Sequence, residues 1–377
     1  MAVHMNKVMS WFVISNVVNN NLLSKAFSAK VLHGTRNMSY TVRKLEFKEF
    51  GDPYKVLNLV ESKCEEPQNN QVVVKFLLAP VNPADINTVQ GVYPIKPELP
   101  GVPGAEAVGE IVAVGSQTKT LQVGDRVICN TQPASTWRTH AVVDESDLLQ
   151  VPKDIGLVEA AGATSNPATA YRMLKDFVTL APGEVVLQNG GNSAVGQNVI
   201  QLAAAWGLVS VNVVRDRPDL PALKSYLTQL GAHHVLTEGE FEKQRDFFEK
   251  NSLKKPQLAL NCVGGKSALS ILRALRNNGV MVTYGGMSRE PVTAPTSVFI
   301  FKDISLRGFW MTRWHKSHRN TEVQKEMYKD LFDLMRQGKL KAPSHKIVPL
   351  DQYKDAISNT MNVKGYAGFK YFLDFTS

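Results

Sequence analysis

A run of small residues near the middle of the chain has the types and spacing needed to bind the phosphates of a dinucleotide. Gly191, Ser193 and Gly196 occupy the three glycine positions of a G-x-G-x-x-G pattern. The run follows a short apolar segment, residues 185–188, and precedes a segment with helical periodicity. Such a turn lets the backbone approach a pyrophosphate, and the helix N-terminus presents unpaired amides to the anion. The pattern indicates a dinucleotide site, with a purely structural glycine turn as the alternative.

The residues after the next predicted strand indicate which dinucleotide binds. An acidic residue at this place usually contacts the ribose hydroxyls of NAD, but this chain has Arg215, Asp216 and Arg217. A guanidinium forms bidentate, charge-assisted hydrogen bonds with a phosphate. The pattern therefore favours NADPH, through its 2′-phosphate. A solvated charge cluster ahead of the next helix is the alternative, and Asp216 keeps NADH open.

The residue types that hold a catalytic or structural zinc ion are not gathered in this sequence. Catalytic zinc sites use Cys, His and Glu ligands, and a structural site built from cysteines needs four of them close together. The chain has only Cys64, Cys129 and Cys262, which are widely separated and also do not fit a disulfide framework. We therefore expect no metal and three free thiols. A proton donor must then replace the Lewis acid of a zinc enzyme.

Two patterns of secondary structure must position these residues. From residue 41 to about 151, short β-rich runs are interrupted by Gly and Pro, which predicts a barrel-like domain. After residue 166, apolar strands alternate with helical segments, which predicts an α/β domain with a doubly wound parallel sheet of the Rossmann type. The expected strands of this sheet are residues 185–188, 209–214, 234–237, 258–262, 280–284 and 304–306.

The charge distribution argues against a nucleic-acid partner. The formal net charge is +9, but the first 45 residues contain six basic and no acidic residues, so the remainder carries only +3. A nearly balanced body offers no basic stripe for a phosphate backbone.

Residues 1–38 contain Lys, Arg, Ser and Asn but no acidic residues, which is typical of a mitochondrial presequence. They predict that the protein is located in the mitochondrial matrix. A disordered extension and a secretory signal are the alternatives. The apolar run over residues 8–18 is too short for a membrane span.

Longer segments give the chain a family resemblance. From about Lys44 to the C-terminus it resembles the zinc-free, quinone oxidoreductase-like branch of the medium-chain dehydrogenase/reductase superfamily, and within it the family of mitochondrial trans-2-enoyl-CoA reductases. Ala105 stands where zinc-dependent members have His. The segments that carry the resemblance include Asn82-Pro83-Ala84-Asp85, Gly91-Val92-Tyr93-Pro94, Gly104-Ala105-Glu106, Thr136-Trp137-Arg138-Thr139, Asn166-Pro167-Ala168-Thr169, Asn261-Cys262-Val263-Gly264-Gly265-Lys266, Tyr284-Gly285-Gly286-Met287 and Gly308-Phe309-Trp310.

This resemblance implies a GroES-like catalytic domain formed by residues 40–165 and a return segment, 320–377, with a Rossmann domain over 166–319 between them. It also implies a homodimer that uses NADPH to reduce trans-2-enoyl thioesters of coenzyme A or acyl carrier protein, in mitochondrial fatty acid synthesis. An NADPH-dependent quinone or alkenal reductase of the same superfamily is one alternative. A non-catalytic NADPH-binding partner protein is the other.

The resemblance also implies roles for individual residues. Tyr93 matches the family's catalytic tyrosine. A phenol suits this role, because it can hydrogen-bond or protonate the enolate that forms when hydride reaches the β-carbon. Packing of Tyr93 on the barrel is the alternative. Ala194 stands where relatives often have Gly. The implied NADPH contacts are Asn166, Asn192, Ser193, Ala194, Val195, Arg215, Asp216, Arg217, Tyr284, Gly285, Gly286, Met287, Phe309, Trp310, Met311 and Lys370, in addition to Gly191 and Gly196 of the glycine turn.

Overall fold

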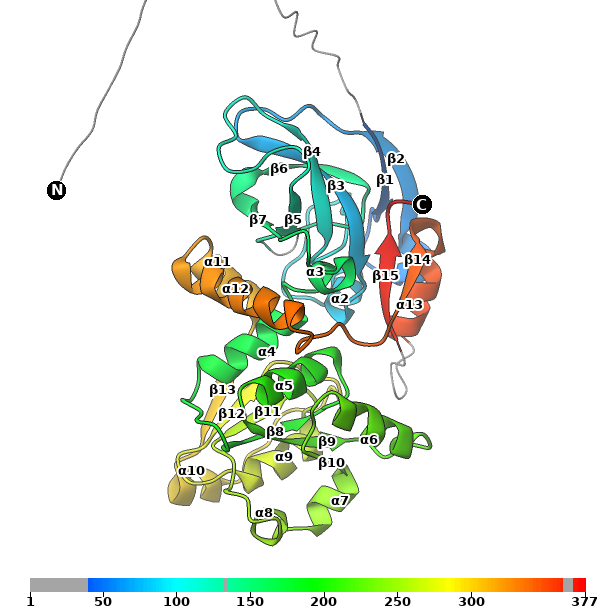
Figure 1. The fold of residues 1–377 in the computed structure, drawn as a ribbon. Helices are drawn as coiled ribbons and strands as arrows, with labels where there is room; N and C mark the ends of the chain where they lie inside the picture. Colours follow the sequence, from blue (N-terminus) through cyan, green and yellow to red (C-terminus); the bar gives the residue numbers. More distant parts are fainter. Residues whose placement is uncertain (1–39, 132–133, 362–368) are drawn as a thin grey trace, which may run out of the picture. The chain divides into compact units, whose positions relative to one another are not determined.

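Two large β-sheets organise the part of the chain that the computed structural model describes, residues 40–131, 134–361 and 369–377 (Figure 1). One is a six-stranded parallel sheet, and the other is a seven-stranded, mainly antiparallel sheet. This arrangement confirms the predicted α/β fold class. The predicted leader, residues 1–38, lies outside the described residues.

The parallel sheet has the strand order β10-β9-β8-β11-β12-β13. Five of its strands end within one residue of the predicted bounds. The sixth, predicted at residues 304–306, begins one residue later, because the N–H of the buried Ile304 donates to the carbonyl of Val298. It also ends two residues later, at Gly308, because Arg307 and Gly308 continue the pairing with the neighbouring strand. The strands are β8 (Val185–Asn189), β9 (Val209–Val214), β10 (His234–Thr237), β11 (Leu258–Asn261), β12 (Val280–Thr283) and β13 (Ser305–Gly308).

Both faces of this sheet are buried, which explains why its strands are continuous apolar runs. Val186 clusters with Val199 of one helix, whereas the next residue, Leu187, clusters with Ile271 of another. Successive side chains of a strand point to opposite faces, so the two helices cover opposite faces. The helices around this sheet are α4 (Asn166–Lys175), α5 (Ala194–Ala205), α6 (Leu220–Gln229), α7 (Glu238–Lys243), α8 (Phe247–Lys250), α9 (Gly265–Ala274) and α10 (Thr296–Lys302).

The second sheet combines the early β-rich region with strands from the end of the chain. Its order is β14-β15-β3-β4-β5-β7, and β6 also pairs with β3. A hydrophobic core lies against this sheet and the antiparallel pair β1–β2. Its largest fully buried aromatic side chains are Trp137, Phe47 and Phe76. The strands are β1 (Thr41–Glu46), β2 (Asn58–Lys63), β3 (Gln71–Pro80), β4 (Val108–Val114), β5 (Arg126–Cys129), β6 (His140–Asp144), β7 (Leu148–Gln150), β14 (His345–Pro349) and β15 (Lys370–Asp374).

The remaining helices connect or flank the sheets. Among them, α2 begins with a proline in its first turn, and Asp85 accepts the N–H of Asn82 to complete the cap. None of the described helices is long and apolar enough to cross a membrane. These helices are α1 (Pro53–Val56), α2 (Pro83–Val89), α3 (Leu157–Ala161), α11 (Met311–His318), α12 (Glu322–Arg336) and α13 (Tyr353–Met361).

Candidate active site

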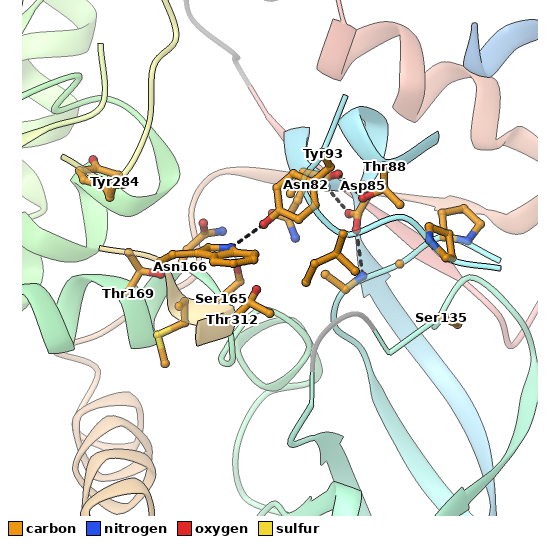
Figure 2. A pocket seen from close by; sticks show the side chains of 18 of the residues that line it. Asn82, Asp85, Thr88, Tyr93, Ser135, Ser165, Asn166, Thr169, Tyr284 and Thr312 are labelled. Carbon is orange, nitrogen blue, oxygen red and sulfur yellow. Dashed lines mark hydrogen bonds between the residues drawn. The ribbon is translucent and has the colours of Figure 1, made fainter. Parts of the chain in front are cut away.

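The main cavity among the described residues has a volume of about 190 Å³ and is lined by segments associated with both sheets. Figure 2 shows Tyr93, Asn82 and Asp85 from the α2 region across from Tyr284, which follows β12. Seven residues with predicted functions line this cavity: Tyr93, Asn166, Val195, Tyr284, Phe309, Trp310 and Met311.

Backbone hydrogen bonds attach the loop that carries Tyr93 to the end of α2. The carbonyl of Asn87 accepts the N–H groups of Val92 and Tyr93, at 3.0 and 3.1 Å. Gly91, immediately before Val92, has a φ of +74°. A Cβ at this position would lie 2.9 Å from the Cβ of Phe50. Only glycine fits such a turn without strain. The position of Tyr93 therefore follows the position of α2.

The Tyr93 hydroxyl is hydrogen-bonded to Trp310 in the cavity. The indole Nε1 donates to the phenol oxygen at 2.8 Å, and the two rings meet edge to face with centroids 6.2 Å apart (Figure 2). Because an indole N–H can only donate, Tyr93 uses a lone pair in this bond. Its own O–H remains a donor for a second acceptor. A phenol held in this way can hydrogen-bond an oxygen that gains negative charge.

The glycine turn between β8 and α5 has the shape that a dinucleotide phosphate requires. A Cβ at Gly191 would lie 2.9 Å from the Cβ of Asn212, and a Cβ at Gly196 would lie 2.6 Å from the carbonyl oxygen of Gly190. Both positions therefore need glycine. Ser193 is the N-cap of α5, where its hydroxyl accepts the N–H of Gly196 at 3.1 Å. The residues present thus fit a pyrophosphate at this helix N-terminus.

Gly190 is a part of this turn that the sequence pattern missed. It lies one residue before the assigned motif and has φ of +60°. A Cβ there would lie 2.4 Å from the Sγ of Cys262, the residue that follows β11. Gly190 therefore makes the left-handed step at the end of β8 and allows close contact with the neighbouring strand. The repeat of two adjacent glycines was the available signal.

The three charged residues predicted to recognise a 2′-phosphate lie directly after the carboxyl end of β9. Arg215 and Asp216 are exposed, whereas the side chain of Arg217 is only 6% exposed and lies 3.6 Å from Asp219. The N–H of Arg217 donates to the Asp216 carboxylate. Ligands of open α/β sheets bind beyond the carboxyl ends of the strands, which is where these residues lie.

The predicted loop after β12 lies at the same end of the sheet. The N–H of Tyr284 donates to the carbonyl of Asn261, and the N–H of Met287 donates to the carbonyl of Cys262. These bonds fasten residues 284–287 to the end of β11. Tyr284 lines the cavity, whereas Met287 is 62% exposed.

A buried polar cluster next to the cavity is the main feature that sequence reasoning missed. The Glu106 carboxylate accepts hydrogen bonds from Asn82 Nδ2 at 2.9 Å, Thr164 Oγ1 at 3.0 Å and Ser165 N at 2.8 Å. Asp85 accepts the N–H groups of Asn82 and Ala105. These residues come from three separate stretches of the chain, so their contacts appear only in the folded protein.

Lys370, predicted as an NADPH contact, lies in this cluster. Its ammonium is buried and donates to Asn82 Oδ1. Lys370 also lines a second, smaller cavity together with Asn166. Its charge compensates the two neighbouring carboxylates of Asp85 and Glu106. The structure thus brings Lys370 near the cavity and directs its ammonium toward Asn82.

Burial shifts the pKa values of all three charged groups in the cluster. Burial raises the pKa of Asp85 to about 7, although backbone hydrogen bonds and the Lys370 charge oppose the shift. Burial also raises the pKa of Glu106 and lowers the pKa of Lys370. The ammonium and the hydrogen bonds are therefore needed to keep negative charge in this interior.

The described residues contain no group of three or more His, Cys, Asp or Glu side chains arranged to hold a metal ion. Cys64, Cys129 and Cys262 are all buried free thiols, as predicted. Asn82, Asp85, Thr88, Ser165, Thr169 and Thr312 also line the cavity but were not among the predicted site residues. Asn82, Asp85 and Thr169 did belong to segments that carried the family resemblance.

Two family models match the chain. The alcohol dehydrogenase GroES-like domain matches residues 68–165, and the zinc-binding dehydrogenase model matches residues 194–332. The human mitochondrial enoyl-acyl-carrier-protein reductase is 48% identical over 338 residues, which cover 87% of this chain and 90% of that protein.

Solved structures give the same result. The Etr1p/NADP/crotonyl-CoA complex superposes with a TM-score of 0.82 at 34% identity, covering 89% of this chain and 100% of that chain. The mitochondrial 2-enoyl thioester reductase Etr1p/Etr2p heterodimer from Candida tropicalis gives a TM-score of 0.81 at 35% identity with the same coverage. The chain therefore belongs to the family of mitochondrial enoyl-acyl-carrier-protein reductases, within the medium-chain dehydrogenase/reductase superfamily.

Proposed function

We infer that this protein catalyses the NADPH-dependent reduction of trans-2-enoyl thioesters to acyl thioesters in mitochondria, the last step of an elongation cycle in fatty acid synthesis. The observation that supports this most is the lining of one cavity by Tyr93 together with Asn166, Val195 and Tyr284, beside the glycine turn. The substrate is an enoyl thioester of coenzyme A or of acyl carrier protein. A cavity that combines a hydroxyl donor with residues that would hold NADPH suits this chemistry.

Different residues are proposed to bind different parts of NADPH. The glycine turn and Ser193 suit the pyrophosphate, Arg215 and Arg217 suit the 2′-phosphate, and Tyr284 lies on the cavity side. When bound, NADPH supplies the hydride that reduces the β-carbon of the enoyl thioester.

Tyr93 is the proposed catalytic residue. Reduction at the β-carbon moves negative charge to the thioester oxygen and the α-carbon, and a hydroxyl donor lowers the energy of that charge. The hydrogen bond from Trp310 occupies a lone pair of the phenol and orients its O–H. Tyr93 can then hydrogen-bond the enolate oxygen or deliver its proton to the α-carbon. Either role requires the hydroxyl group itself.

The assembly proposed for this chain is a homodimer formed at the β13 end of the parallel sheet. In the described part of the chain, β13 pairs on only one side, with β12. An open strand edge presents unpaired backbone groups. Apolar side chains lie exposed beside it, including Ile300 at 66% and Phe301 at 76% on α10, together with Leu306 on β13 itself. A second copy related by a two-fold axis would cover this edge and these side chains.

Replacing Tyr93 by Phe tests the proposed reaction. We expect kcat with a trans-2-enoyl thioester to fall by about 10²–10⁴-fold, the usual contribution of a positioned proton donor, because the ring remains and only the hydroxyl is lost. The KM for NADPH should stay within about threefold, since the variant removes no cofactor contact. Tyr54→Phe, on α1 outside the cavity lining, is the control. Steady-state kinetics measure both values, and unchanged turnover in Tyr93→Phe would remove Tyr93 from the mechanism.

Replacing Arg215 by Ala tests the choice of cofactor. Hydrogen bonds to charged groups contribute about 1.5–3 kcal/mol, so we expect the KM for NADPH to rise about tenfold or more. The KM for NADH should change little, because NADH has no 2′-phosphate. Arg273→Ala, an exposed arginine on α9, is the matched control. An equal rise in KM for both cofactors would contradict 2′-phosphate recognition.

Replacing Phe301 by Glu tests the proposed homodimer. A charge in the exposed apolar patch should oppose its burial against a second copy, so sedimentation equilibrium should show a dimer for the unaltered protein and a monomer for the variant. Val323→Glu, at another exposed apolar position on α12, should remain a dimer. A monomeric unaltered protein, or a dimer that persists in Phe301→Glu, would contradict this interface.

A further inference from the structure

We propose that Glu106 is a positioning residue for the reduction, whose buried carboxylate sets the distance between the Tyr93 hydroxyl and the cofactor-side wall of the cavity. This inference rests on the proposed catalytic function of Tyr93. Glu106 lies on the loop before β4, is 1% exposed and is not itself a lining residue of the cavity. Its influence must therefore pass through its hydrogen-bond partners.

One oxygen of Glu106 holds the substrate side of the cavity. Oε1 accepts Asn82 Nδ2 at 2.9 Å, and Asn82 is the residue from which α2 starts. At the other end of this seven-residue helix, the carbonyl of Asn87 accepts the N–H of Tyr93. A short helix transmits displacement as a rigid rod, because its backbone hydrogen bonds fix each turn. A shift at Asn82 therefore moves Tyr93.

The other oxygen holds the cofactor side. Oε2 accepts Thr164 Oγ1 at 3.0 Å and the backbone N–H of Ser165 at 2.8 Å. Ser165 immediately precedes α4, and the first turn of α4 brings Asn166 and Thr169 to the cavity wall. A single carboxylate thus joins the helix behind Tyr93 to the helix on the cofactor side.

A third set of contacts connects the Thr164 side of the cluster to the Tyr93 hydroxyl. The carbonyl of Thr164 accepts His315 Nε2 at 3.0 Å, which assigns the proton of this imidazole to Nε2. His315 lies on α11, and the residue that caps the start of α11 is Trp310. The Trp310 indole then donates to the Tyr93 hydroxyl at 2.8 Å. The hydroxyl is therefore held from α2 on one side and from α11 on the other, and both paths lead back to Glu106.

The donors around Glu106 require a carboxylate, not merely a polar group. Asn82 Nδ2 and the N–H of Ser165 can only donate, and they approach different oxygens. A glutamine at position 106 would have one oxygen and one NH₂ group, so one of these donors would face another donor. Asn82 cannot turn its amide around to compensate, because its Oδ1 accepts the Lys370 ammonium. The substitution therefore loosens one wall of the cavity while it keeps the size of the side chain.

The variant Glu106→Gln tests this inference when it is measured in two backgrounds. A misplacement of about 1 Å lowers turnover by up to about 10²-fold, so we expect kcat to fall at least about tenfold, with the KM for NADPH within about threefold. In a Tyr93→Phe background the same substitution should lower kcat less than about threefold, because the group that it positions is gone.

The control is Asp125→Asn, the same chemical change at another buried carboxylate. Asp125 is 7% exposed and accepts the N–H of Gln122 at 2.9 Å in the turn before β5, outside the cavity lining. We expect its kcat to equal that of the unaltered protein. Thermal unfolding and NADPH binding are recorded for every variant, so that a loss of folded protein is recognised.

If Glu106→Gln does not fold, Thr164→Val carries the test, because it removes one donor to Glu106 and keeps the shape of the side chain. Its kcat should fall about threefold or more, and this loss should also disappear in the Tyr93→Phe background. Equal losses in both backgrounds would overturn the positioning function while leaving the proposed reaction intact. Unchanged turnover in Tyr93→Phe alone would instead overturn the function of Tyr93, and this inference with it.

Discussion

The candidate active site depends on a negative charge, the Glu106 carboxylate, that is buried between the segments forming the cavity. A buried charge is stable only when it is paired and hydrogen-bonded. Here Asn82, Thr164 and Ser165 donate to its two oxygens, and the Lys370 ammonium supplies the opposite charge. Asn82 lies at the start of α2, Thr164 and Ser165 lie at the start of α4, and Lys370 lies on β15. The contacts that stabilise the buried charge therefore also assemble the cavity. The stability of the site and its geometry thus have the same physical origin.

The two large sheets contribute different parts of the proposed chemistry. The carboxyl ends of the parallel strands carry the glycine turn, Arg215 and the loop after β12, where a dinucleotide fits. The region around the other sheet contributes α2 and the Tyr93 loop. In the proposed reaction, the residues that would hold NADPH and the hydroxyl donor Tyr93 therefore come from different parts of the fold. Trp310, which follows the parallel sheet, contacts Tyr93 directly and connects the two parts.

Much of this arrangement follows from local patterns in the sequence. The strands of the parallel sheet are continuous apolar runs because both faces are covered, so five of them are predictable to within one residue. The need for glycine at position 190 was not predicted, because it arises from a positive φ and from the close contact with Cys262, which follows another strand. The Glu106 cluster joins residues far apart in the chain, and no local periodicity signals such contacts. The role of Tyr93 and the domain boundaries at residues 165 and 319 stay predictions.

A comparison of substrates distinguishes reduction of enoyl thioesters with NADPH from reduction of quinones by the same fold. Oxidation of NADPH and of NADH is followed with short, medium and long trans-2-enoyl thioesters of coenzyme A and acyl carrier protein, with a quinone as the competing substrate. We expect a higher kcat/KM with NADPH than with NADH, and a higher kcat/KM for at least one thioester than for the quinone. If the quinone were turned over faster than every thioester, the protein would be a quinone reductase and not an enoyl thioester reductase.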